Sequence, residues 1–252
     1  MGVAALVAAL ALSPVAYLQG QSQSGAWGGD PALTSWAVLG LRAAGAEAPG
    51  SLDYLRTQEP SLTTSNDVAL VALAEQALGA DTSPLRIRLK VKPSGQIGET
   101  LNSTFWGVLA LGHASPATKR FLLAHQASSG GFAWYLNGKP DSNDTAAALE
   151  AFRVAGIRGA PVTRAVRYLR AFQNRDGGFE LTDGRGSDAQ STAWAIQGIV
   201  AAGQKPPRSA FAYLARMRRD DGSYRYSARY VTTPVWVTSQ VLAALAKKPF
   251  PL

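Results

Sequence analysis

Cysteine is absent from this 252-residue chain, and histidine occurs only twice. Without cysteine the chain has neither a disulfide framework nor a thiolate zinc site, and its sequence does not reveal its redox compartment. A metal centre would depend on carboxylates almost alone, because His113 and His125 are the only imidazoles. A P-loop and a dinucleotide-binding fingerprint are also missing. The sequence therefore predicts a protein without a metal ion or a cofactor.

Acidic residues are scarce relative to basic ones: 17 Asp and Glu stand against 25 Lys and Arg, which gives a net charge of +8. Such an excess is compatible with nucleic acid, an anionic membrane, a cell wall or an acidic ligand, and it does not choose among them. We expect no nucleic-acid partner, and we keep contact with a membrane or cell wall as an open interpretation of the basic charge. The hydrophobic content of 46% suffices for one large core or two small ones.

Long hydrophobic runs are absent as well. The apolar run from Val3 to Leu12 is too short to cross a bilayer and lacks the basic residues that precede the core of a secretory signal. Residues 1–13 are therefore either a signal-like apolar segment or the first helix. The signal-like interpretation predicts an exported or cell-surface protein, and the other predicts a cytoplasmic one.

The chain does contain an internal repeat. Gln173, Gly177 and Phe179 define a frame of glutamine, glycine four residues later and an aromatic residue six residues later. The same frame starts at Gln126 and Gln21, and related copies start at Arg218 and Val91. A second element, an alanine-rich run that begins at a threonine, follows each frame. Its six anchor residues are Thr34, Asn66, Thr104, Thr145, Thr192 and Thr238, which lie 32 to 47 residues apart.

Repeats of this length indicate stacked supersecondary units. Each unit is typical of two helices, the first ending at the glycine-rich turn and the second starting near the anchor threonine, whose hydroxyl we expect to cap it. Six units predict an all-α, six-plus-six helix closed toroid (an α/α barrel), with residues 14–252 as a single domain. Residues 84–93 alternate apolar and basic residues as a strand does. We nevertheless predict a short helix there, because the repeat requires one and Ser83-Pro84 is typical of a helix start.

The frame resembles the QW motif of squalene and oxidosqualene cyclases, and Gln21 to Trp27 (QSQSGAW) matches it fully. From about Ala16 to Leu245 the chain resembles the prenyltransferase/squalene-cyclase repeat family. The wider terpenoid cyclase/protein prenyltransferase superfamily also contains the toroid domain of cobalamin carriers. This resemblance implies a toroid whose inner helices line a cavity. It says less about activity, because one fold hosts many functions.

Squalene-hopene cyclases carry Asp-x-Asp-Asp-Thr-Ala at the start of an inner helix, and the middle Asp protonates the substrate. Here the aligned residues read DSNDTA, from Asp141 to Ala146, and Asn143 occupies the donor position. A carboxamide has no proton of useful acidity. In addition, Asp141 recurs as Asp30 and Asp188, each four residues before an anchor threonine. A repeated Asp is better explained as a helix cap than as a catalytic acid.

The sequence therefore favours a non-catalytic toroid domain that binds a hydrophobic or amphipathic small molecule, a cobalamin-like ligand or a protein partner. It predicts no cyclised product from squalene or a linear prenyl diphosphate. The alternative is a squalene-hopene-type terpenoid cyclase-like enzyme that uses Asp141 or Asp144, although triterpene cyclases place their cavity between two helical domains. A structural cell-surface module is the second alternative. The candidate ligand-binding residues are aromatic, and they either pack between helices or form the rim of a binding site: Trp36, Trp106, Trp194, Trp236, Trp134 and Tyr135.

Overall fold

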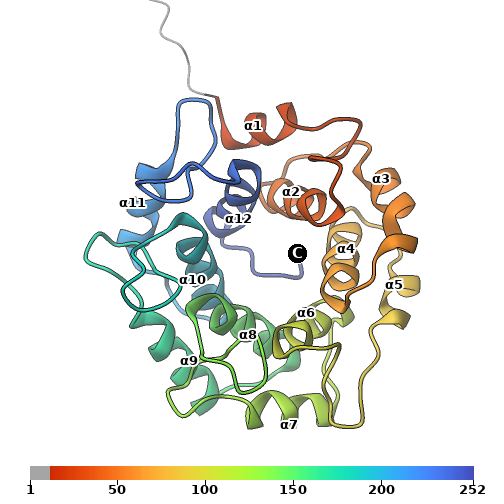
Figure 1. The fold of residues 1–252 in the computed structure, drawn as a ribbon, viewed down its shortest axis with the longest axis vertical. Helices are drawn as coiled ribbons and strands as arrows, with labels where there is room; N and C mark the ends of the chain where they lie inside the picture. Colours follow the sequence, from red (N-terminus) through yellow and green to blue (C-terminus); the bar gives the residue numbers. More distant parts are fainter. Residues whose placement is uncertain (1–11) are drawn as a thin grey trace, which may run out of the picture.

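The computed structural model describes residues 12–252 and shows two concentric rings of helices (Figure 1). Within this range there are twelve α-helices, one 3₁₀ helix and isolated β-bridges, but no strand. The inner ring consists of α2 (Pro31–Ala43), α4 (Ser65–Ala77), α6 (Leu101–Leu111), α8 (Ser142–Ala155), α10 (Ala189–Ala201) and α12 (Pro234–Ala246). The outer ring consists of α1 (Pro14–Gly20), α3 (Ser51–Gln58), α5 (Ser83–Arg88), α7 (Pro116–Ala124), α9 (Ala160–Arg170) and α11 (Arg208–Met217), and η1 (Glu59–Ser61) follows α3.

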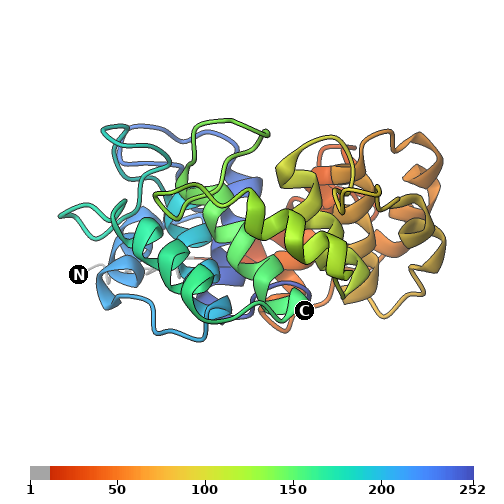
Figure 2. The same ribbon diagram turned by 90° about the horizontal axis from the view of Figure 1, so that it is seen from below.

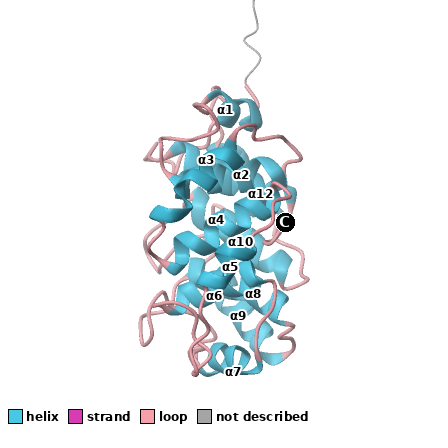
Figure 3. Cartoon of the chain, turned by 90° about the vertical axis from the view of Figure 1, so that its right-hand side faces the viewer, coloured by secondary structure: helices cyan, strands magenta, loops and turns pink. Residues whose placement is uncertain are grey.

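The inner ring is closed. Each inner helix contacts the next one, and α12 contacts α2, so that the last repeat packs against the first. Seen edge-on, the molecule is a flattened ring whose helices are joined by loops on both faces (Figures 2 and 3). The predicted all-α, six-plus-six closed toroid is confirmed.

The inner and outer helices differ in how much of each helix is buried. In the inner helix α6, every residue from Leu101 to Ala110 is buried, because one side of it packs on neighbours and the other faces the centre of the ring. In the outer helix α9, only Ala165, Val166 and Leu169 are buried, and its arginines face outward. A helix that is apolar all round belongs inside, whereas an amphipathic one covers the surface. No helix within residues 12–252 is long and apolar enough to cross a lipid bilayer.

The predicted aspartate caps are confirmed. Asp30, Asp141 and Asp188 are the N-cap residues of α2, α8 and α10, and each carboxylate accepts a hydrogen bond from a backbone N–H three residues later, at 2.6, 2.8 and 2.6 Å respectively. The predicted threonine caps at the anchor positions are wrong. The five inner helices with a threonine anchor begin about one turn before it, so Thr145 and Thr192 lie inside their helices.

The anchor threonines instead join the two repeated sequence elements. Their hydroxyls accept the backbone N–H of the aromatic or aliphatic residue that ends each Gln-Gly frame. This hydrogen bond is 2.9 to 3.1 Å long in five repeats: Trp27 to Thr34, Ile97 to Thr104, Phe132 to Thr145, Phe179 to Thr192 and Tyr224 to Thr238. The glycine of the frame is required because it has a positive φ and touches an outer helix; a Cβ on Gly177 would lie 2.6 Å from the carbonyl oxygen of Ser209.

We expect Thr192→Val to lower the free energy of unfolding by about 1–3 kcal/mol, because it leaves the buried N–H of Phe179 without an acceptor. Chemical denaturation measures this loss. Thr163→Val is the control, since the Thr163 hydroxyl bonds a carbonyl at the exposed start of α9. Equal losses for the two variants would contradict the role assigned to the anchor threonines.

In two segments the structure differs from the sequence expectation or does not describe the residues concerned. The alternating stretch 84–93 forms a helix as predicted, but the helix is limited to α5 (Ser83–Arg88) and its N-cap is Thr82 rather than Ser83. Beyond α5, Val91 forms an isolated bridge with Ile97, which explains the strand-like pattern. The expectation for residues 1–13 falls almost entirely on residues 1–11, which lie outside the described part of the chain.

Candidate functional site

A cavity of about 450 Å³ lies inside the inner ring, at the face where the inner helices begin. All six inner helices and the loops that precede α8, α10 and α12 contribute to its wall. Its lining residues are Ala32, Trp36, Asn66, Asp67, Leu70, Asn102, Trp106, Trp134, Asp141, Asn143, Asp144, Ala147, Leu181, Arg185, Gln190, Trp194, Tyr226, Trp236 and Gln240. The volume falls within the range of small-molecule sites, which is about 300–1,000 Å³.

Three tryptophans form the floor of this cavity. Trp36, Trp106 and Trp194 each lie six residues after an N-cap, on the alternate inner helices α2, α6 and α10. Their ring centroids are 5.5 to 5.7 Å apart, and all three contacts are edge-to-face. The indoles are at most 8% exposed, so they meet across the centre of the ring and do not form a rim at its mouth. The packing interpretation therefore describes the triad, and the rim interpretation does not, although the three indoles line the cavity.

The other predicted aromatic residues lie nearer the mouth. Trp236 is stacked on Trp36 at 6.5 Å, and Trp134 is 43% exposed; both line the cavity. Tyr135 is 64% exposed and contacts the ring of Trp134, but it is not part of the cavity wall. The structure thus brings together five of the six predicted residues. Their role in ligand binding stays a prediction.

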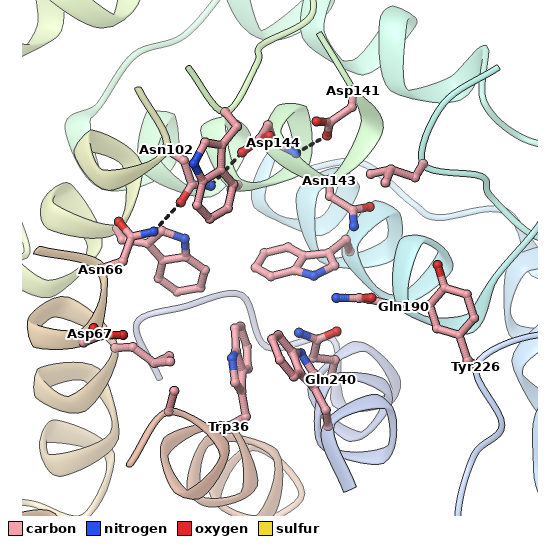
Figure 4. A pocket seen from close by; sticks show the side chains of 18 of the residues that line it. Trp36, Asn66, Asp67, Asn102, Asp141, Asn143, Asp144, Gln190, Tyr226 and Gln240 are labelled. Carbon is pink, nitrogen blue, oxygen red and sulfur yellow. Dashed lines mark hydrogen bonds between the residues drawn. The ribbon is translucent and has the colours of Figure 1, made fainter. Parts of the chain in front are cut away.

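A partial ring of carboxamides was missed by the sequence analysis. Asn66, Asn102, Asn143 and Gln190 are each the second residue after an N-cap, on the consecutive inner helices α4, α6, α8 and α10. All four line the cavity, and Figure 4 shows Asn143 and Gln190 pointing into it. Counting from the caps rather than from the anchors would have found them. The residue at the motif's donor position is therefore one member of an amide set.

Asp144 has the most perturbed environment in the cavity wall. Its Oδ1 accepts a hydrogen bond of 2.6 Å from the amide of Asn102, whose oxygen in turn accepts one of 2.8 Å from the amide of Asn66 (Figure 4). Burial, together with the neighbouring carboxylate of Asp141, raises the pKa of Asp144 to about 8, although the hydrogen bond from Asn102 lowers it. Asp144 therefore keeps its proton at neutral pH.

Asp141 is both the N-cap residue of α8 and a lining residue of the cavity. Burial raises its pKa, whereas hydrogen bonds from Asp144 lower it. Burial also raises the pKa of Asp188, which is the equivalent cap of α10 but does not line the cavity. Arg185 is the one cation among the lining residues, and it lies on the loop before α10.

Residues after α12 close the ring from the opposite side, where the chain turns back towards its centre (Figure 1). Phe250 is 1% exposed, and its ring lies 6.0 Å from that of Trp36. Its backbone N–H donates to Glu150 at 2.6 Å, and its carbonyl accepts from Arg153; both of these residues belong to α8. The tryptophan triad thus rests on a second buried aromatic layer.

No protein-family model matches the chain. Over 130 residues it is 35% identical to drimenyl diphosphate synthase of Streptantibioticus cattleyicolor. This match covers 49% of the chain and 24% of that enzyme, so the matched part is about a quarter of the relative's length.

Solved structures match the chain more completely. A protein from Actinoplanes has a TM-score of 0.70 at 17% identity, with 93% of this chain and 97% of that chain covered. A variant of the type II terpene cyclase MstE from Scytonema, solved with geranylgeranyl dihydroxybenzoate as substrate, has a TM-score of 0.67 at 16% identity, with 93% and 94% covered. The ent-copalyl diphosphate synthase of Streptomyces platensis has a TM-score of 0.61 at 20% identity, with 86% and 50% covered.

At these identities the similarity shows the fold. It agrees with the resemblance seen in the Gln-Gly-aromatic frame and with the closed double ring of helices. The chain has the α/α-toroid fold of the terpenoid cyclase/protein prenyltransferase superfamily.

Proposed function

We propose that the chain is a terpenoid cyclase-like enzyme, which binds a linear isoprenoid in the cavity and starts its cyclisation by proton transfer from Asp144. The observation that carries the proposal is a buried carboxyl, kept neutral by its surroundings, in the wall of a cavity whose floor is three indoles. A proton donor beside an apolar, aromatic surface is what the protonation of an alkene needs.

The hydrogen bond from Asn102 favours the ionised form of Asp144 at the moment of transfer. When its O–H bond breaks and a C–H bond forms on the alkene, a carboxylate remains, and the amide of Asn102 already donates to it. Asn66 holds that amide in orientation. The cyclised cation then loses a proton to water, and the carboxylate recovers its proton from solvent.

A carboxyl whose pKa is about 8 is a weak acid in water, so the cavity must also stabilise the cation that proton transfer creates. The indole faces of Trp36, Trp106, Trp194 and Trp236 supply this stabilisation, because the face of an aromatic ring is its negative part. A cation over an indole gains about 0.5–2 kcal/mol at each suitably placed ring, more where water is excluded. The acid and the aromatic floor therefore work as one site.

A second candidate function is binding without catalysis, and Asn143 favours it. This neutral residue occupies the place where the resembling cyclases carry their acid. The sequence argument against a cyclase was that triterpene cyclases place their cavity between two helical domains. It carries less weight because the similar terpene cyclase MstE matches this chain over 94% of its own length. The comparisons support the cyclase-like alternative better than the non-catalytic interpretation.

The test is incubation of the protein with farnesyl and geranylgeranyl diphosphates and with uncharged geranylgeranyl conjugates in deuterated water. We expect a cyclic product that carries one solvent-derived deuterium per initiation, detected by gas chromatography and mass spectrometry. Because Asp144 is the donor, Asn143→Asp should change the rate by less than about tenfold. Binding without product in the natural chain, together with product from Asn143→Asp, would establish the non-catalytic candidate instead.

A further inference from the structure

The bore of the toroid is closed at one level. About two turns into each inner helix, one side chain lines the cavity at this level, and the sizes alternate around the ring. The helices α2, α6 and α10 contribute the tryptophan triad, whereas α4, α8 and α12 contribute the smaller side chains of Leu70, Ala147 and Gln240. Because the three indoles contact one another at 5.5 to 5.7 Å, they leave no passage between them.

Little space lies beneath this level. The void between the triad and the segment after α12 measures about 10 Å³, and it is bordered by Trp36, Trp194, Gln197 and Phe250, among others. A ligand that enters from the open face therefore has only the upper cavity of about 450 Å³. Filled at the packing density of about 0.75 found in protein interiors, that volume holds on the order of 15 to 20 carbon atoms.

Trp36 is the residue on which the floor depends most. Its ring contacts Trp106, Trp194 and Trp236 and also Phe250 in the lower layer. In the described part of the chain, no other indole ring packs against the ring of Phe250. Loss of this side chain would merge the upper cavity with the space above Phe250.

We propose that the tryptophan triad sets the length of the isoprenoid that this protein accepts, with Trp36 as the specificity-determining residue. The cavity takes chains of farnesyl to geranylgeranyl size and excludes a triterpene such as squalene. The proposal rests on the proposed function for the chemical class of the ligand, but it does not depend on turnover.

The experiment is a set of dissociation constants for farnesol, geranylgeraniol and squalene, measured by competition with a fluorescent farnesyl analogue. For the natural chain we expect both alcohols to bind at least about tenfold more tightly than squalene. Trp36→Ala should reduce the preference for geranylgeraniol over squalene to about threefold or less. Leu123→Ala, a truncation of an exposed side chain on the outer helix α7, is the control and should leave the preference unchanged.

A second variant tests the opposite change, in case Trp36→Ala does not fold. Ala147 lies at the same level on α8 and is 2% exposed, so Ala147→Leu should shorten the cavity. We expect geranylgeraniol affinity to fall at least about tenfold relative to farnesol.

Equal binding of squalene and geranylgeraniol by the natural chain would overturn the proposal, and so would an unchanged length preference in the variants that fold. A shifted preference without any cyclic product would support this inference and contradict the cyclase-like function. Failure of all three ligands to bind would overturn both.

Discussion

Asp144→Asn is expected to lower the rate of product formation by about 100- to 10,000-fold, the range that general acids contribute, and to leave isoprenoid affinity within about threefold. Asparagine copies the shape of the protonated acid. Its oxygen can accept the hydrogen bond from Asn102, and its amide nitrogen takes the place of the acid's O–H. The substitution therefore removes the transferable proton and little else. Single-turnover product formation and ligand titration measure the two effects separately.

Two comparisons strengthen this test. Asp188→Asn changes the N-cap aspartate of α10, which is the counterpart of Asp141. Asp188 does not line the cavity, and its substitution should leave the rate within about threefold. Chemical denaturation of Asp144→Asn should show stability equal to or above that of the natural chain, because Asp144 is neutral in the folded state. Full activity in Asp144→Asn would exclude this residue as the acid.

The sequence predicted the fold well because its repeat records local constraints. The cap aspartates at 30, 141 and 188 and the glycine of each frame serve needs that recur in every helix pair, so they recur in the sequence. The role of the anchor threonines was misjudged for a physical reason. Their partner is the backbone N–H that ends the preceding frame, 7 to 14 residues earlier, and helix-cap preferences do not report that contact.

The site was less predictable because ring closure creates it. The hydrogen bond between Asn102 and Asp144 joins residues 42 positions apart, and it exists only because α6 and α8 are neighbours in the inner ring. The three tryptophans were predicted as candidate ligand-binding residues, yet their position as a floor follows from the bore being narrow enough for the indoles to touch. Comparison with the cyclase motif drew attention to the missing acid at Asn143 and away from its buried neighbour.

Glu150→Gln is expected to stabilise the protein at alkaline pH. Glu150 is completely buried on α8, and burial raises its pKa from 4.5 to about 8. Its Oε1 has no hydrogen-bond partner in the described structure, while Oε2 accepts from the N–H of Phe250. That N–H and the charge of Arg153 stabilise the ionised form of Glu150 and so lower its pKa. Burial has the larger effect, and the pKa stays above its ordinary value.

The sign of the effect follows from the raised pKa. Between about pH 4.5 and pH 8 the unfolded chain loses this proton and the folded chain keeps it, so the contribution of Glu150 to stability is complete below pH 4.5 and is lost as the pH rises to 8. Glutamine keeps an acceptor for Phe250 and does not titrate. Relative to the natural chain, Glu150→Gln should therefore gain on the order of 3 kcal/mol between pH 5 and pH 8, measured by chemical denaturation.

Burial also raises the pKa of Asp144. Its titration therefore lowers the free energy of unfolding of both proteins by the same amount as the pH rises, and this effect cancels in the difference between them. Glu99→Gln, at an exposed position in the loop before α6, should leave the pH dependence unchanged. A difference between Glu150→Gln and the natural chain that stays constant from pH 5 to pH 8 would mean that Glu150 is already ionised in the folded state. The segment carrying Phe250 would then be held against α8 by an ionised Glu150 over this whole range, and its attachment would not change between pH 5 and pH 8.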